Sequence, residues 1–206
     1  MTVTQFLDWL ELAALACLTL LGVGRALALY ARGVRVVAFD RTWWPVQVPA
    51  ALIAGTGLLL WAYEIVACAW PLPVHVVPRA WRAVLVNALT IKAVGAVVLL
   101  ASVLVYGLAL RGLGVSWRLG VDRDRPGPLV TAGIYARMRH PIYVGLGLFS
   151  IGTSLVLGQL LFLVLAALAV VGLHAAVLVE ERFLVQIYGD AYREYCQRVG
   201  RYVTWR

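Results

Sequence analysis

The chain has 206 residues, of which 63% are hydrophobic and 14% charged, and its formal net charge is +8. A soluble domain carries about 25% charged residues, so the composition excludes an ordinary soluble protein and indicates a polytopic membrane protein. The positive charge does not predict nucleic-acid binding, because the arginines lie in short loops beside apolar stretches, as topological signals do.

Five apolar stretches predict an all-α, polytopic membrane helix bundle with about five transmembrane helices. A span needs about 20 residues, which every stretch except the fourth supplies. Whether the fourth crosses the bilayer completely stays open. The last two stretches meet at Gly158 and predict a tight helical hairpin. In chain order the stretches are Phe6–Tyr30, Val46–Trp70, Val84–Leu110, Ile142–Leu157 and Gln159–Val179.

The basic residues of the loops predict the orientation of the chain. Arginines are numerous in the first and third loops and sparse in the second. By the positive-inside rule, the first and third loops and the C-terminal tail face the cytoplasm, with the N-terminus outside, in a multi-pass protein of a bacterial inner membrane. Tryptophans near the predicted span ends fit an interfacial aromatic belt; these are Trp43, Trp44, Trp70, Trp81 and Trp117.

Two charged residues, Glu64 and Lys92, fall inside predicted spans. Counted from the outer ends of their spans, their depths differ by only ~5 Å at 1.5 Å per residue. We therefore expect a Glu64–Lys92 ion pair. The alternative is that each side chain reaches the interface or lines a polar cavity.

The chain after Val179 keeps helical spacing until Gly189 interrupts it. Asp190 is the expected N-cap of a second, short helix. We expect this C-terminal amphipathic helix to lie on the cytoplasmic surface, where it could close over a ligand of the third loop.

The three cysteines are Cys17, Cys68 and Cys196, and they form neither a CxxC motif nor a Cys/His pairing. Neither a disulfide framework nor a zinc site is predicted, and no metal ligand is assigned.

The candidate site is predicted where the third loop enters the fourth apolar stretch. Pro141 at a helix start leaves neighbouring N–H groups free, and with Arg139 and His140 they suit a carboxylate or phosphate. Glu180 and Glu181 end the fifth stretch on the same side of the membrane, and the hairpin brings them close to His140. A basic end facing a carboxylate pair suits a zwitterionic ligand.

A second interpretation assigns these residues no ligand. Arginines before a span are ordinary topology signals, and Glu180 and Glu181 can form a solvated helix end. Tyr135 and Tyr143, taken alone, are typical interfacial anchors. His174 is expected to be a buried packing histidine near a helix end.

Four blocks follow one another between Leu129 and Arg201, and they are Leu129–Tyr135, Arg139–Gly145, Glu180–Leu184 and Tyr188–Tyr195. In order and spacing they resemble the isoprenylcysteine carboxyl methyltransferase family. The same blocks recur more loosely in phospholipid methyltransferases and in sterol reductases.

The resemblance implies an S-adenosylmethionine-dependent membrane methyltransferase with a small lipophilic acceptor, a carboxylate or an amine, that enters from the bilayer. It implies that Leu129 and Val130 line the cofactor through their backbone and that Tyr135 packs against it. It assigns the polar groups of the cofactor to His140, Pro141, Ile142 and Tyr143. Glu180 matches an acidic residue of the family near the cofactor, with Glu181 adjacent, and Arg139 is the further candidate from the anion site described above. No residue is assigned to proton transfer.

Two positions depart from the family: its usual proline after the final valine is Gly200 here, and the second position is Ala176. Its eukaryotic carboxyl methyltransferases carry an arginine four residues before the first functional glutamate, where this chain has Ala176, which argues against a prenylcysteine carboxylate as the substrate. A sterol-reductase-like membrane reductase using NADPH and a non-catalytic membrane scaffold or sensor remain alternatives. The chain is expected to be a single membrane domain, with three N-terminal helices in 1–111 and the cofactor-binding half in 112–206.

Overall fold

The computed structural model describes residues 2–34, 44–70, 74–114 and 127–204, and this part of the chain is helical. Its only pairing of the β type is an isolated bridge between Val84 and Gln159. The predicted all-α class is therefore confirmed. The helices are α1 (Val3–Tyr30), α2 (Trp44–Ala69), α3 (Leu89–Leu113), α4 (Pro141–Leu157), α5 (Leu160–Tyr188) and α6 (Asp190–Arg198), with the short 3-10 helices η1 (Arg79–Arg82) and η3 (Gly133–Ala136).

Three of these helices, α1, α3 and α5, are long and apolar enough to cross a membrane. The described part of α2, Gly55–Ala69, and the whole of α4 are apolar but shorter. At 1.5 Å per residue, the 17 residues of α4 extend ~25 Å, slightly less than the hydrocarbon thickness. The chain is a multi-pass membrane protein, and its five crossings stay a prediction.

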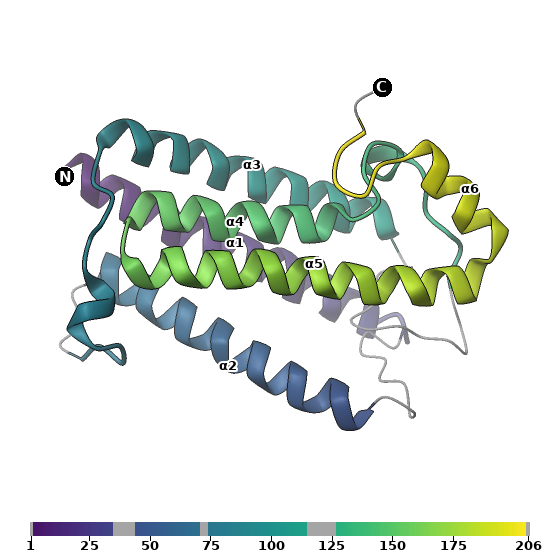
Figure 1. Cartoon of the computed structure of the whole chain (residues 1–206), viewed down its shortest axis with the longest axis horizontal. Helices are drawn as coiled ribbons and strands as arrows, with labels where there is room; N and C mark the ends of the chain where they lie inside the picture. The colour runs from purple at the N-terminus through teal and green to yellow at the C-terminus, as the bar shows by residue number, and fades with distance from the viewer. Residues whose placement is uncertain (1, 35–43, 71–73, 115–126, 205–206) are drawn as a thin grey trace.

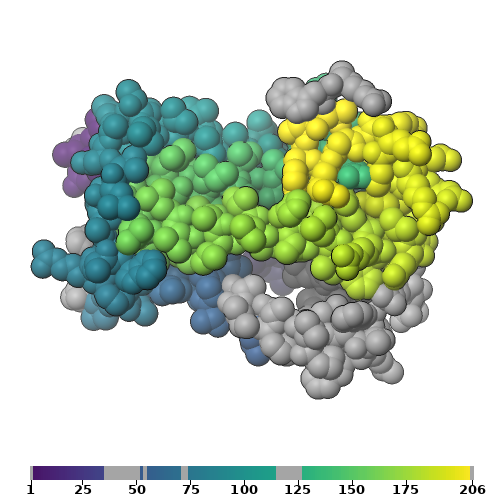
Figure 2. Space-filling view, viewed as in Figure 1, coloured from purple at the N-terminus to yellow at the C-terminus, as the bar shows by residue number. Residues whose placement is uncertain are grey.

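Helices α1, α3, α4 and α5 lie side by side, and α2 is inclined across one face of them (Figure 1). The two termini lie at opposite ends of the bundle. We call the end that holds η3, the start of α4 and α6 the tail end, and the end that holds the α4–α5 turn the loop end. Figure 2 shows the C-terminal segment as a continuous block of side chains at the tail end.

Helices α3 and α4 pack most closely because glycines line their contact. A Cβ added at Gly152 would lie 2.8 Å from Leu99 Cγ and 3.0 Å from Leu99 N. A Cβ added at Gly145 would lie 3.1 Å from Tyr106 N. Small residues allow helix backbones to approach in a membrane, where no hydrophobic effect drives them together. This contact fixes the start of α4, and therefore His140, against α3.

The predicted hairpin at Gly158 is confirmed. Gly158 adopts φ +64° and ends α4, and its carbonyl accepts hydrogen bonds from Leu85 N–H at 2.8 Å and Val86 N–H at 3.1 Å. This pairing explains why α3 starts at Leu89, five residues after the predicted Val84: the apolar residues before it form an extended segment bound to the hairpin turn.

The end of α5 and the start of α6 differ from the prediction. Helix α5 continues to Tyr188, so Glu180 and Glu181 lie within it and do not end it. The N-cap of α6 is Gly189, at φ +55°, and Asp190 is the first helical residue and makes no capping hydrogen bond. Glycine supplies the positive φ at low steric cost, so Gly189 ends α5 and lets α6 begin at the next residue.

The expected Glu64–Lys92 pair is wrong. Glu64 is fully buried, and its carboxylate accepts hydrogen bonds from Val76 N–H at 3.1 Å and Val77 N–H at 3.2 Å, and lies 3.3 Å from His75 Nδ1. The segment after α2 folds back over the loop end and supplies these groups. Lys92 faces a cavity there instead, as the alternative interpretation allowed.

The aromatic belt is found at the loop end, where Trp70 and Trp81 are exposed. The exposed Trp9 joins them, with its ring centroid 5.7 Å from that of Trp70. Trp43, Trp117 and the side chain of Trp44 lie outside the described residues.

Candidate functional site

Helix α4 begins at Pro141, as predicted, with His140 as its N-cap residue. The first backbone bond within the helix runs from Val144 N–H to His140 O, at 3.1 Å. Pro141 has no N–H, so the N–H groups of Ile142 and Tyr143 point out of the helix start without an intrahelical acceptor. They form a potential anion site.

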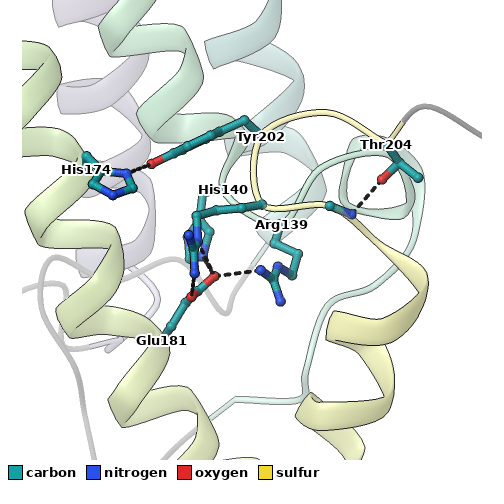
Figure 3. A network of polar contacts seen from close by, with 8 residues as sticks. Arg139, His140, His174, Glu181, Tyr202 and Thr204 are labelled. Atoms are coloured by element: carbon teal, nitrogen blue, oxygen red, sulfur yellow. Dashed lines mark hydrogen bonds and ion pairs between the residues drawn. The ribbon is translucent and has the colours of Figure 1, made fainter.

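The Glu181 carboxylate joins three positively charged or imidazole groups at the tail end (Figure 3). Its Oε1 lies 2.9 Å from an Arg139 guanidinium nitrogen and 3.2 Å from His140 Nε2. Arg201 donates from Nε to Oε1 at 3.0 Å and from its terminal nitrogen to Oε2 at 2.7 Å. We call Arg139, His140, Glu181 and Arg201 the Glu181 hub. The predicted proximity of His140 to the acidic pair is confirmed.

The hub includes a residue that the sequence did not single out, Arg201. It is held there by backbone pairing between the tail and the segment before α4: Arg139 N–H donates to Gly200 O at 3.1 Å and His140 N–H to Arg201 O at 3.2 Å. Thr204 N–H donates in turn to the carbonyl of residue 137 at 3.0 Å. The one signal in the sequence was the position of Arg201 at the limit of the family-like blocks.

Burial favours the neutral form of His140. Its side chain is almost completely buried, and burial lowers its pKa below the ordinary value, although the Glu180 and Glu181 carboxylates act in the opposite direction. A carboxylate only accepts hydrogen bonds, so the ring carries its hydrogen on Nε2 and donates it to Glu181. Hydrogen bonding to Glu181 raises the pKa of Arg201, which stays charged.

Glu180 faces a different set of groups from its neighbour. Its carboxylate is half-buried and interacts electrostatically with Tyr135, His140 and Tyr143. Burial, with Glu180 nearby, raises the pKa of Tyr135, so its phenol stays protonated. Both oxygens of Glu181 are occupied within the hub, so Glu180 is the carboxylate better placed to meet a ligand.

Helix α6 covers the loop that leads into the site. Tyr192 and Tyr195 of α6 are buried, and Leu129 packs against them. Tyr195 Oη donates to Tyr135 O at 2.5 Å, and burial raises the pKa of Tyr195 to about 12. This agrees with the expected closure over the third loop. Val130 is half-buried beside Leu129.

Two buried polar atoms near the hub have no hydrogen-bond partner among the described residues, Tyr192 Oη and Arg139 Nε. Buried polar groups in proteins nearly always have a partner. Both atoms can donate to a bound polar ligand, which is a specific reason to expect one here. No group of three or more His, Cys, Asp or Glu side chains within the described ranges could hold a metal ion.

His174 is exposed, so the expectation of a buried packing histidine is wrong. Its Nδ1 lies 2.5 Å from Tyr202 Oη, and this contact attaches the tail to α5 (Figure 3). Ala176 is also exposed on α5. It offers no charged group at the position where the eukaryotic carboxyl methyltransferases of the family have an arginine.

Comparisons with known proteins identify a family and several similar proteins. A family model described as phospholipid methyltransferase matches residues 87–191. Methanethiol S-methyltransferase 1 of Bradyrhizobium diazoefficiens is 30% identical over 188 residues, covering 87% of this chain and 65% of that protein. Protein-S-isoprenylcysteine O-methyltransferase of Schizosaccharomyces pombe is 37% identical over 89 residues, covering 43% of this chain and 38% of that protein.

A solved structure shares the fold. The eukaryotic intramembrane Ras methyltransferase ICMT (isoprenylcysteine carboxyl methyltransferase) superposes with a TM-score of 0.51 at 22% identity, over 82% of this chain and 55% of that one. The chain spans less than two thirds of the length of each of these relatives.

Proposed function

The chain belongs to the phospholipid methyltransferase family, and from this premise we propose that it transfers a methyl group from S-adenosylmethionine to a small lipophilic acceptor. The observation that carries the proposal is the meeting of the α4 start, Glu180 and the covering helix α6 at one end of the bundle. These groups match a dipolar nucleoside in charge and in hydrogen-bonding capacity.

Each residue of the site would bind a different part of the cofactor. The N–H groups of Ile142 and Tyr143 would bind its carboxylate, because a helix start carries partial positive charge. Glu180 would balance its positive charge, and the Tyr135 ring would pack against it. The unpartnered donors, Tyr192 Oη and Arg139 Nε, give further capacity for its polar atoms. Glu181 is a positioning residue, because its oxygens already bind the hub.

Bound S-adenosylmethionine supplies an electrophilic methyl group on a sulfonium, which an acceptor takes by in-line displacement. The protein aligns the reacting atoms and excludes water. Helix α6 and the buried Tyr192 and Tyr195 exclude water here. The nucleophilic form of a thiol is the thiolate, so a thiol acceptor would give its proton to water as the methyl group is transferred, and no residue is assigned as the base.

We favour a small thiol over a carboxylate or an amine as the acceptor. Methanethiol S-methyltransferase 1 is 30% identical over 87% of this chain, including the N-terminal helices, whereas the higher identity to the isoprenylcysteine O-methyltransferase of S. pombe covers only 43% and the ICMT structure, which covers 82%, is 22% identical. Ala176 supports the same choice, because it offers no cation to hold a substrate carboxylate. The discriminating assay is transfer of labelled methyl to methanethiol, farnesylcysteine and phosphatidylethanolamine in turn.

Isothermal titration in detergent tests the cofactor. Glu180→Gln should weaken S-adenosylmethionine binding by about tenfold, the equivalent of one lost charge-assisted contact. Glu194→Gln, an exposed carboxylate on α6, is the matched control and should bind normally. NADPH binding without S-adenosylmethionine binding would favour the reductase. Binding of neither at millimolar concentration would favour the scaffold.

We further propose that the tail end faces the cytoplasm. The argument rests on the arginine-rich first and third loops, which flank that end. Labelling with a membrane-impermeant thiol reagent tests it: Cys196 of α6 should react in inverted membrane vesicles and not in intact spheroplasts. The opposite pattern would reverse the orientation.

A further inference from the structure

A second polar site lies at the loop end, at the opposite end of the bundle from the Glu181 hub. It is a cavity of about 300 Å³. The side chains that line it come from α1, α2, α3 and the segments between helices, and include Asp8, Cys68, His75, Arg82, Lys92 and Gln159. None of them takes part in the proposed methyl transfer, and the inference below does not depend on that function.

Lys92 is the most informative of these residues. It is the fourth residue of α3 and is only 7% exposed, yet within the described structure its ammonium makes neither a hydrogen bond nor an ion pair. Asp8 interacts with it electrostatically, at a distance beyond that of an ion pair. Most of the side chain is covered, and the ammonium opens into the cavity, where a cation held at the wall is placed to bind an anion. Its orientation into a cavity indicates that a bound anion completes the site.

The charges around the cavity favour an anion. Glu64 lies beside the cavity but does not line it, and its carboxylate is engaged by two backbone N–H groups and by His75 Nδ1. This leaves Asp8 against Arg82 and Lys92, an excess of one positive charge among the lining residues. Glu11 is buried on α1 but does not line the cavity.

The wall of the cavity is held by backbone hydrogen bonds. Leu160 N–H donates to Ala83 O at 3.0 Å, next to the two bonds that Gly158 O accepts. These contacts fix the segment that carries Arg82 over the hairpin turn. The site is therefore preformed and does not depend on a mobile side chain at the surface.

The surroundings of the cavity identify the class of ligand. Trp9, Trp70 and Trp81 are exposed at the same end, and such tryptophans mark the depth of the lipid headgroups. We propose that this cavity binds the phosphodiester of a phospholipid headgroup, held by the Lys92 ammonium and the Arg82 guanidinium, with Asp8 facing an amine or hydroxyl of the same headgroup. Basic pockets between membrane helices bind lipid headgroups in this way.

Native mass spectrometry of the delipidated full chain in detergent tests the proposal. Phosphatidylglycerol or phosphatidylethanolamine should be retained in preference to diacylglycerol, which has the same chains and no phosphate. Lys92→Met should weaken retention by about tenfold, and Lys92→Arg should restore it. Arg193→Met removes one charge from an exposed residue of α6 and should leave retention unchanged.

Further outcomes show whether the cavity recognises the phosphate group or only the acyl chains of the lipid. Displacement of the lipid by millimolar inorganic phosphate would support the phosphate site. Equal retention of diacylglycerol and phospholipid, or undiminished retention by Lys92→Met, would overturn it. If Lys92→Met does not fold, Arg82→Gln in the surface helix η1 tests the same contact and should also weaken retention.

Discussion

Removing the charge of Glu181 should destabilise the tail end strongly. Glu181→Gln keeps the shape of the side chain but deprives two guanidinium groups and one imidazole of their shared anion. The Arg139 side chain is 10% exposed and cannot regain water, whereas that of Arg201, at 34%, partly can. Breaking a buried ion pair costs about 3–5 kcal/mol, and partial exposure of the hub reduces this, so we expect a loss of about 2–4 kcal/mol.

A double-mutant cycle measures how much of this loss of unfolding free energy comes from the Glu181–Arg201 ion pair. Reversible unfolding in mixed micelles would give the free energy of unfolding for Glu181→Gln, Arg201→Met and the double variant. The coupling energy should be about 1–2 kcal/mol. Glu194→Gln should be as stable as the parent, because Glu194 is exposed. A coupling energy within about 0.5 kcal/mol of zero would refute the hub as a stabilising unit.

Two further predictions concern the hairpin and the buried imidazole. A Cβ at Gly158 would lie 1.8 Å from Val86 O at a positive φ, so Gly158→Ala should cost more than about 3 kcal/mol of unfolding free energy. The control Gly172→Ala, with open space at its Cβ, should be neutral or stabilising. Equal melting temperatures of the two variants would contradict the close contact between Gly158 and Val86. Because burial lowers the native pKa of His140, its contribution to stability is complete above the unfolded value of about 6.5 and falls as the pH drops below it. Melting temperature against pH should show this loss in the parent and less of it in His140→Gln.

Local signals in the sequence were sufficient for several boundaries of the fold. Pro141 at a helix start and glycines at 158 and 189 mark positions where proline or a positive φ is required, and each was found where expected. The start of α3 was missed because Val84 and its neighbours are apolar in either conformation. What makes them extended is their pairing with Gly158, which lies more than seventy residues later in the sequence.

The sequence predicted which parts of the chain meet at the site, but not which groups each side chain contacts. A hairpin must return Glu181 to the side of His140, so their proximity followed from the order of the helices. Depth along the membrane also placed Glu64 and Lys92 at one end correctly. It did not reveal which groups they face, because the folded-back segment that supplies the partners of Glu64 has no periodic pattern. Arg201 was missed for the same reason.

The backbone pairing of residues 200–204 with the segment before α4 has a consequence for biogenesis. Arg201 is synthesised twenty residues after Glu181 and more than sixty residues after His140. During that interval Glu181 has only two of its three partners, and no tail covers the helix start. The nascent chain therefore completes the Glu181 hub last, when the tail pairs with the segment before α4.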